Sequence, residues 1–279
     1  ALMSLGREVL LVTDSVALPV LEAGCDALDL PRSCLREFPF ESAETDHPHR
    51  ASNAADCCTV SDRYVHELLA SASGKRLSHL IAIERAGPSH TAQSARHCAP
   101  PFESETLNLA AGFESEVVEA AWNLCYNMRG ESINAHTAKV HRLFEQVAAA
   151  RNDVVTVGIA DGGNEIGMGR YPWSVLRAAI ALGPAGKVAC RIPTQHTLLA
   201  GVSNWGGYAL ALAVCQLQGR ADLARPWDLN DQRQLVETLV AEAGAVDGVT
   251  RTRQATVDGL PLETYLQPLF GLRRTIGLE

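Results

Sequence analysis

Four short apolar runs, rich in valine and isoleucine, recur along the chain and predict buried β-strands. They cover Val9 to Thr13, Leu80 to Ile83, Val154 to Ile159 and Lys187 to Ile192. Near-continuous apolar runs, as opposed to strict polar and apolar alternation, are typical of strands that are covered on both faces. We therefore expect these four segments to lie inside the protein.

Stretches with helical character lie between and after these runs. They are Glu116 to Arg151, with an interruption near Gly130, Ser174 to Ala181, and Trp205 to Gln218. Strands that alternate with helices predict an α/β layered fold, with a mostly parallel sheet flanked by helices. A length of 279 residues is compatible with one domain, and we expect a single domain over residues 1–279.

Two segments follow neither periodicity and are expected to be loops or insertions. They are residues 41–62 and 88–108, which contain many small polar residues and prolines. The first includes His47-Pro48-His49 and the pair Cys57-Cys58. Because no apolar strand holds the two histidines, we interpret this pattern as a solvated loop and not as a metal site.

Composition and charge indicate which partners and which cellular location to expect. The net charge is −8 with acidic and basic residues intermixed, so we expect no nucleic-acid partner, which would need a concentrated basic face. The eight cysteines include no C-x-x-C spacing, which favours a reduced, intracellular protein. With no run of about 20 apolar residues and no signal-peptide pattern, we expect no membrane partner and a cytoplasmic location, or the mitochondrial matrix if the source is eukaryotic.

Three of the predicted strands run directly into an acidic residue. These residues are Asp14, Glu84 and Asp161. Ligands of open parallel sheets bind beyond the carboxyl ends of the strands, so the three carboxylates would share one crevice if their strands are neighbours. For Asp14, capping of the following helix is an equally good interpretation, whereas glutamate is a poor cap and Glu84 is more readily explained by function.

The sharpest motif is the glycine-rich phrase from Gly158 to Gly169. A buried strand leads into Asp161, two glycines allow a tight turn, and Asn164 and Glu165 add an amide and a second carboxylate. The phrase is neither the dinucleotide fingerprint nor a P-loop. The alternative is a flexible turn with incidental polar residues, but flexibility alone does not require three such side chains together.

Two further phrases carry polar groups that could hold an anion. Ser203 and Asn204 precede an apolar helix, where they could cap it or contribute to an anion cradle of backbone N–H groups. Arg129, in the phrase Tyr126-Asn127-Met128-Arg129, is predicted to lie on a helix and could clamp a carboxylate with its guanidinium. A surface salt bridge is the alternative for Arg129. The pair Arg273-Arg274 is interpreted as solvated surface.

Five phrases, in order, resemble the C-terminal domain of the D-glutamate cyclase family. They are Ile81 to Gly87, Tyr126 to Arg129, Asp161 to Gly169, Ala200 to Ala209 and Gly244 to Thr250, and Thr256 to Pro261 resembles the family's closing segment. The resemblance as a whole runs from about Val9 to the C-terminal region. Family members have a further strand and an acidic, glycine- and proline-rich loop before the position where this chain starts, so we expect part of the family's site to lie upstream.

The resemblance implies a lyase that converts D-glutamate, a small anionic amino acid, to 5-oxo-D-proline and water. It also implies a divalent cation. We expect Glu84 or Glu165 to act as general base, and Asp161, Asp14 and the remaining glutamate to hold the metal. Hard oxygen ligands favour Mn²⁺ or Mg²⁺, and the absence of a His/Cys cluster in the sequence argues against zinc.

The substrate would be gripped and oriented by a second group of polar side chains. Either Arg129 or Arg85 is expected to bind the α-carboxylate, and the amide and hydroxyl groups are expected to orient the substrate; these are Asn127, Asn164, Ser203 and Asn204. The alternatives are a manganese-dependent phosphatase that uses the same carboxylates, and a non-catalytic metal- or small-molecule-binding module. A homo-oligomer is compatible with the sequence.

Overall fold

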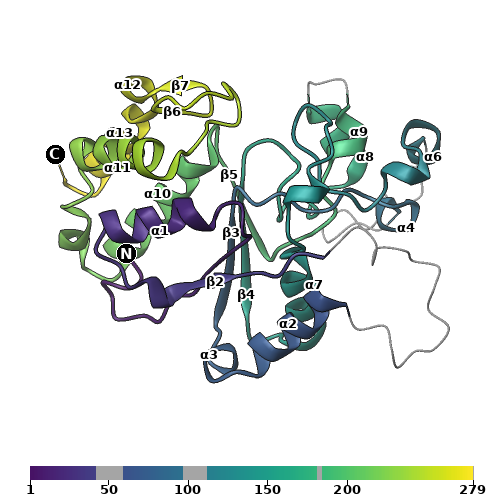
Figure 1. The fold of residues 1–279 in the computed structure, drawn as a ribbon, viewed down its shortest axis with the longest axis horizontal. Helices are drawn as coiled ribbons and strands as arrows, with labels where there is room; N and C mark the ends of the chain where they lie inside the picture. The colour runs from purple at the N-terminus through teal and green to yellow at the C-terminus, as the bar shows by residue number, and fades with distance from the viewer. Residues whose placement is uncertain (42–58, 97–111, 181–183, 279) are drawn as a thin grey trace. The chain divides into compact units, whose positions relative to one another are not determined.

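Three parallel strands form the sheet that carries two of the acidic strand ends. In the computed structural model, which describes residues 1–41, 59–96, 112–180 and 184–278, their order is β3 (His79–Ile83), β4 (Val155–Ala160) and β5 (His196–Leu199). The central strand β4 is almost wholly buried, which explains its continuous apolar sequence. Parallel pairing places the carboxyl ends of β3 and β4 at the same edge of the sheet (Figure 1).

Contacts group the chain into two compact units, which are described separately. The first consists of Ala1–Glu37 with Asn204–Glu279, and the second is Phe38–Ser203. Both contain parallel strands accompanied by helices, so the predicted α/β class is confirmed. None of the described helices has the length and apolar character needed to cross a membrane.

The second unit surrounds the three-stranded sheet with helices and short helical turns. Besides the strands it contains α2 (Val60–Ala70), α3 (Ala72–Lys75), α4 (Ala92–Ala95), α6 (Phe113–Glu116), η4 (Glu119–Ala121), η5 (Asn134–His136), α7 (His141–Ala150), α8 (Trp173–Ala179) and α9 (Ala185–Val188). In Figure 1, α2 and α7 lie side by side. Arg142 on α7 donates to the Asp62 carboxylate on α2, with an Nε–Oδ1 distance of 2.8 Å.

The core of the second unit contains several aromatic side chains. Phe113 and Trp173 pack edge to face, with ring centroids 5.1 Å apart, and both are buried. Ile166, from the loop after β4, joins the same cluster. A Cβ atom at Gly158 would lie 2.4 Å from the Ile166 carbonyl oxygen, so the loop returns directly over β4 and requires glycine there.

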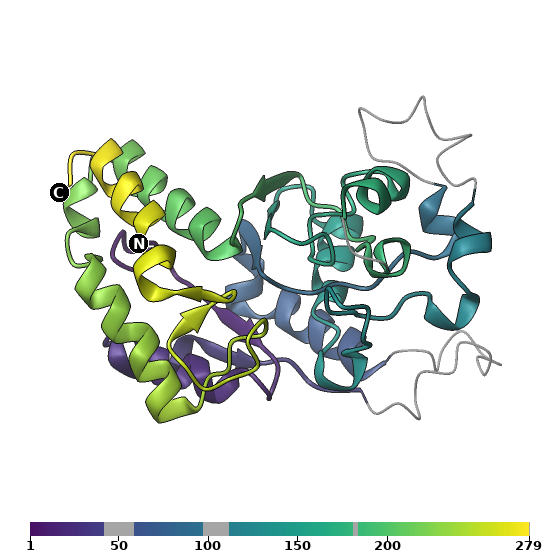
Figure 2. The ribbon, with the colours of Figure 1, turned by 90° about the horizontal axis from the view of Figure 1, so that it is seen from above.

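The first unit pairs two short strands and several helices. These elements are β1 (Leu11–Thr13), α1 (Leu18–Ala27), η1 (Arg32–Cys34), β2 (Leu35–Glu37), α10 (Ser203–Leu217, which begins in the second unit), η6 (Ala221–Ala224), α11 (Leu229–Ala243), β6 (Thr256–Val257), β7 (Leu260–Pro261), α12 (Leu262–Tyr265) and α13 (Gln267–Thr275). Helices α1 and α11 pack where Gly24 approaches Leu239. Figure 2 shows the β6–β7 hairpin leading into α12 and α13.

Three of the four predicted strands are confirmed, as β1, β3 and β4, and the fourth is wrong. Residues 187–192 contain the end of α9 and an isolated bridge between Cys190 and Ser89. Val188 and Cys190 are buried, so the apolar run reflects burial and not a strand. Strands β2 and β5 were not predicted, because both are short and none of their residues is buried.

The predicted helix from Glu116 to Arg151 is also wrong over most of its length. Only α7 within it is a full helix, and the segment before it forms turns, 3₁₀ turns and bridges. The positive φ angle at Gly130 agrees with the expected interruption, whereas that at Asn123 is incompatible with a helix before it. Of the two expected loops, residues 60–62 begin α2 and residues 92–95 form α4, while residues 42–58, with His47, His49, Cys57 and Cys58, and residues 97–108 lie outside the described residues.

Candidate active site

The structure brings Glu84, Asp161 and Glu165 together at the edge of the three-stranded sheet. One carboxylate oxygen from each residue lies within 4.8 Å of the others. Glu84 follows β3 and Asp161 follows β4, so the predicted convergence of these two strand ends is confirmed. The side chains range from exposed Glu84 through half-buried Asp161 to buried Glu165. The cluster therefore opens to solvent at Glu84.

The backbone at Glu84 is in the left-handed region, with a φ angle of 52°. This conformation is unfavourable for a residue with a side chain and is commonly found at functional positions. The Glu84 N–H donates to the Ile159 carbonyl oxygen at 3.1 Å, which continues the β3–β4 pairing up to this residue. The strained backbone thus turns the chain sharply at the residue that supplies the exposed carboxylate.

The loop after β4 is organised around the Glu165 carboxylate. Its Oε1 atom accepts hydrogen bonds from the N–H groups of Asp161 at 3.3 Å and Gly162 at 2.7 Å. Its Oε2 atom accepts from the Gly163 N–H at 2.7 Å. Gly163 has a φ angle of 111°, which only glycine adopts without strain, and this angle turns its N–H toward the carboxylate.

Repulsion and burial shape the electrostatics of the cluster. Burial, together with the neighbouring Glu84 carboxylate, raises the pKa of Asp161 to about 6, although a hydrogen bond from the Ser203 N–H opposes this rise. Burial also raises the pKa of Glu165, against the effect of the Gly162 and Gly163 N–H groups. Both carboxyl groups therefore hold a proton more readily than in water, and an additional positive charge would favour their ionised forms.

Ser203 links the two carboxylates at the strand ends. Its backbone N–H donates to Asp161 Oδ2 at 2.7 Å, and its hydroxyl donates to Glu84 Oε2. Ser203 is completely buried and is the first residue of α10, whose N-terminus carries a partial positive charge. Ser203, predicted as a substrate-orienting group, thus contacts the carboxylates, and direct substrate binding stays a prediction.

The segment from Tyr126 to Arg129 packs against the glycine-rich loop, but it does so as a turn. The predicted helix around Arg129 is wrong. The Asn164 side-chain amide donates to the Tyr126 carbonyl oxygen at 2.7 Å, and a Cβ atom at Gly162 would lie 2.8 Å from Met128 Sδ. Met128 was not among the predicted site residues, and its place inside this phrase was the only signal for it. Arg129 is exposed beside this contact.

Two further predicted residues of the second unit, Asn127 and Arg85, form hydrogen bonds outside the carboxylate cluster. The Asn127 amide donates to Glu131 Oε2 at 2.7 Å, and Asn127 Oδ1 accepts from the Arg129 N–H at 3.0 Å, which stabilises the turn. The Arg85 guanidinium donates to the Ala138 carbonyl oxygen at 2.8 Å, and its charge lowers the pKa of His141, whose burial is the larger cause.

Asp14 and Asn204 belong to the first unit. The Asp14 carboxylate accepts from the Ala17 N–H at 3.3 Å, but Ala17 is the N-cap of α1 and no side chain caps this helix, so the interpretation of Asp14 as a cap is wrong. The Asn204 side chain hydrogen-bonds to the Tyr265 side chain. The roles of Asp14 in metal binding and of Asn204 in substrate binding stay predictions.

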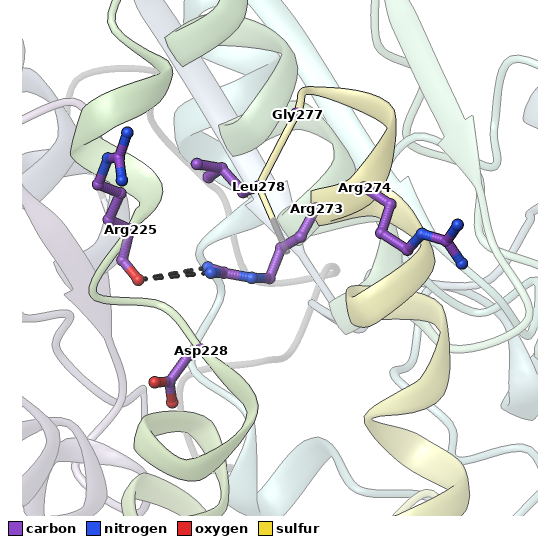
Figure 3. A pocket seen from close by; sticks show the side chains of 6 residues that line it. All are labelled: Arg225, Asp228, Arg273, Arg274, Gly277 and Leu278. Carbon is purple, nitrogen blue, oxygen red and sulfur yellow. Dashed lines mark hydrogen bonds between the residues drawn. The ribbon is translucent and has the colours of Figure 1, made fainter.

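A separate pocket in the first unit contains several arginines. It has a volume of about 720 Å³ and is lined by Arg225, Asp228, Arg273, Arg274, Gly277 and Leu278 (Figure 3). Arg273 is buried and donates to the Ala224 carbonyl oxygen at 2.7 Å, so its prediction as solvated surface is wrong. Figure 3 shows the Arg225 and Arg274 guanidinium groups pointing in different directions, which does not favour a shared anion.

Comparisons with known proteins agree with the site's sequence motifs. A family model described as D-glutamate cyclase-like, C-terminal, matches residues 116–273. The human protein D-glutamate cyclase, mitochondrial, is 34% identical over 140 residues, which cover 50% of this chain and 17% of the human protein. The family match includes Asp161, Glu165 and Ser203, while Glu84 precedes it and is connected to the site by the structure.

Proposed function

Because the chain belongs to the D-glutamate cyclase-like C-terminal domain family, we propose that it is a lyase that cyclises D-glutamate to 5-oxo-D-proline with loss of water. The observation that carries this proposal is the carboxylate cluster of Glu84, Asp161 and Glu165, beside the exposed Arg129 turn. The human relative bears the name of this activity, and the chain spans 17% of that relative's length. If the source is eukaryotic, we propose the mitochondrial location that the relative's name states.

Cyclisation joins the α-amine nitrogen of D-glutamate to its own γ-carboxyl carbon. A C–N bond forms, a C–O bond of the carboxyl group breaks, and two protons of the ammonium group leave with the oxygen as water. The site must therefore remove protons from the amine, reduce the negative charge on the γ-carboxylate, and hold the two groups close together.

The carboxylate cluster fits a divalent cation by its donor chemistry. Clustered oxygen ligands suit Mg²⁺ or Mn²⁺, and burial together with repulsion from Glu84 raises the pKa of Asp161, an effect that a nearby cation would oppose. We assign Asp161 and Glu84 as the main protein ligands, with Glu165 as a further candidate. When bound, the cation would supply the positive charge that polarises the γ-carboxyl group.

The remaining steps fall to side chains of this chain. Glu84 is the most exposed of the three carboxylates and is assigned to accept the proton from the ammonium group. The Ser203 hydroxyl donates to Glu84 Oε2 and orients this carboxylate. Arg129 is assigned to bind the α-carboxylate, because its turn contacts the loop that carries Asp161 and Asn164.

Proton NMR of the purified chain with D-glutamate tests the proposal. The reactions contain Mn²⁺ or Mg²⁺, and L-glutamate serves as the matched control. We expect 5-oxoproline from the D-enantiomer alone, in a reaction that ethylenediaminetetraacetate stops. The absence of product with a folded, metal-bound chain would contradict the proposal for the isolated chain.

The same preparation separates the alternative functions. A metal-dependent phosphatase would release phosphate from a generic ester such as p-nitrophenyl phosphate and would leave both glutamate enantiomers unchanged. A binding module would show a calorimetric signal with Mn²⁺ or D-glutamate and no turnover of either compound. All three candidate functions would depend on the same carboxylates, so loss of activity or binding on substitution of Asp161 alone does not distinguish them.

A further inference from the structure

Glu165 differs from the other two carboxylates in how its oxygens are occupied. A carboxylate offers about four acceptor positions, two on each oxygen. Glu165 uses three of them on the consecutive N–H groups of Asp161, Gly162 and Gly163. Both Glu165 oxygens are therefore engaged by backbone donors of this turn.

We propose that Glu165 is a positioning residue, which fixes the backbone of the 161–163 turn, and that it is neither the general base nor a principal metal ligand. This inference rests on the proposed function and specifies how the work is divided among the three carboxylates. Successive N–H groups that converge on one anion form a nest, and here the anion is supplied by the chain itself. Glu165 is 2% exposed, which agrees with an internal role.

The geometry shows what this turn presents to the site. Asp161 precedes the glycine pair, and Asn164 follows it with its side-chain amide bonded to the Tyr126 carbonyl oxygen at 2.7 Å. Because the turn reverses the chain between β4 and Ile166, a change in the orientation of the three N–H groups would also move the Asp161 side chain. Glu165 thereby acts on the reaction through the position of Asp161.

Substitution Glu165→Gln tests the proposal, because it preserves size but replaces one acceptor oxygen with a donor. In the variant, either a glycine N–H faces the new NH₂ group or the turn rearranges. We expect hydrogen exchange at the amides of Asp161, Gly162 and Gly163 to be at least about tenfold faster than in the wild type. The exchange is followed by NMR on the metal-free protein without substrate.

Glu84→Gln is the matched control, because it removes charge from the same cluster and its side chain accepts from Ser203 instead. We expect it to leave exchange at the three amides unchanged. If Glu165→Gln also leaves exchange at the three amides unchanged, the positioning role is overturned. Because exchange is measured without metal or substrate, the result does not depend on whether the chain is a cyclase.

A second measurement on the wild-type protein does not require a folded variant. Scalar coupling across hydrogen bonds links an amide nitrogen to the carboxyl carbon that accepts its proton. We expect couplings from the Gly162 and Gly163 amides to the Glu165 carboxyl carbon, since both distances are 2.7 Å. Their absence in well-resolved spectra would overturn the proposal, whatever the stability of the Gln variant.

Discussion

Substitution Asp161→Asn should remove function while making the metal-free protein no less stable. The pKa of Asp161 is raised from 3.8 to about 6, first by burial and then by the Glu84 carboxylate. In the folded protein the group therefore binds its proton more tightly than in the unfolded chain. Its contribution to folding is favourable below pH 4 and is lost as the pH rises to about 6, so the ionised carboxylate destabilises the metal-free protein at neutral pH.

The size of this effect follows from the shift. One pKa unit corresponds to about 1.4 kcal/mol, so a shift of about two units sets an upper limit near 3 kcal/mol. Asp161 is half-buried, and water screens part of this energy, which leaves roughly 1 kcal/mol as the expected gain in unfolding free energy for the Asn variant. The Ser203 N–H retains an acceptor, because the asparagine side chain keeps one oxygen.

Thermal unfolding at pH 5 and pH 7.5, with and without Mn²⁺, checks this prediction. The metal-free variant should melt at or above the wild-type temperature at pH 7.5, and the difference should shrink at pH 5, where the wild-type carboxyl group is largely protonated. Mn²⁺ should raise the melting temperature of the wild type and leave that of the variant unchanged. A metal-free variant that melts well below the wild type at pH 7.5 would refute the reasoning.

Three further predictions concern the fold and the substrate clamp. Gly158→Ala should lower the unfolding free energy by about 1–3 kcal/mol, because the added Cβ atom meets a backbone carbonyl oxygen. Gly271→Ala, inside α13 and with open space around it, should raise the unfolding free energy slightly. Melting curves of the two variants check both expectations. Burial lowers the pKa of His141 to about 3, so between pH 6.5 and 3 the unfolded chain binds a proton that the folded chain does not, and the unfolding free energy falls as the pH falls. His141→Gln should reduce the slope of unfolding free energy against pH in this range by about 1.4 kcal/mol per pH unit, as measured by denaturant titrations. Arg129→Met should raise KM for D-glutamate by more than about tenfold with less effect on kcat, and Arg7→Met, at an exposed position, should not; steady-state kinetics that show an unchanged KM would move the clamp elsewhere.

The sequence was most informative where burial and strand geometry coincide. Val155 to Ala160 form the central strand of the sheet, with a neighbour on each side, so a continuous apolar run marked it correctly. The same signal failed for Lys187 to Ile192, because this segment is buried under tertiary contacts such as that of Cys190 with Gly87. Burial by other elements produces apolar runs whatever the local backbone conformation.

The sequence predicted which residues lie together in the candidate site better than it predicted what each of them contacts. Glu84 and Asp161 could be placed together because parallel strands end at one edge of a sheet. The partners of Glu165 and Ser203 could not be predicted, since they depend on the directions of backbone N–H groups. These directions are set by individual φ angles, such as that of Gly163, and a residue pattern carries little information about them.

Backbone N–H groups donate to the carboxylate cluster and orient its oxygens without neutralising their charge. Asp161 and Glu165 accept hydrogen bonds from the N–H groups of Ser203, Gly162 and Gly163, and these donors carry no net charge. They fix the positions of the oxygens but leave the negative charge in place, and burial together with the Glu84 carboxylate raises the pKa of Asp161 against the effect of the Ser203 N–H. A lysine or arginine in their place would lower that pKa and would compete with a metal ion for the same oxygens. Under the proposed metal-binding role, neutral donors leave the negative charge for a cation to balance, and the Asp161→Asn experiment measures how far this charge destabilises the metal-free protein.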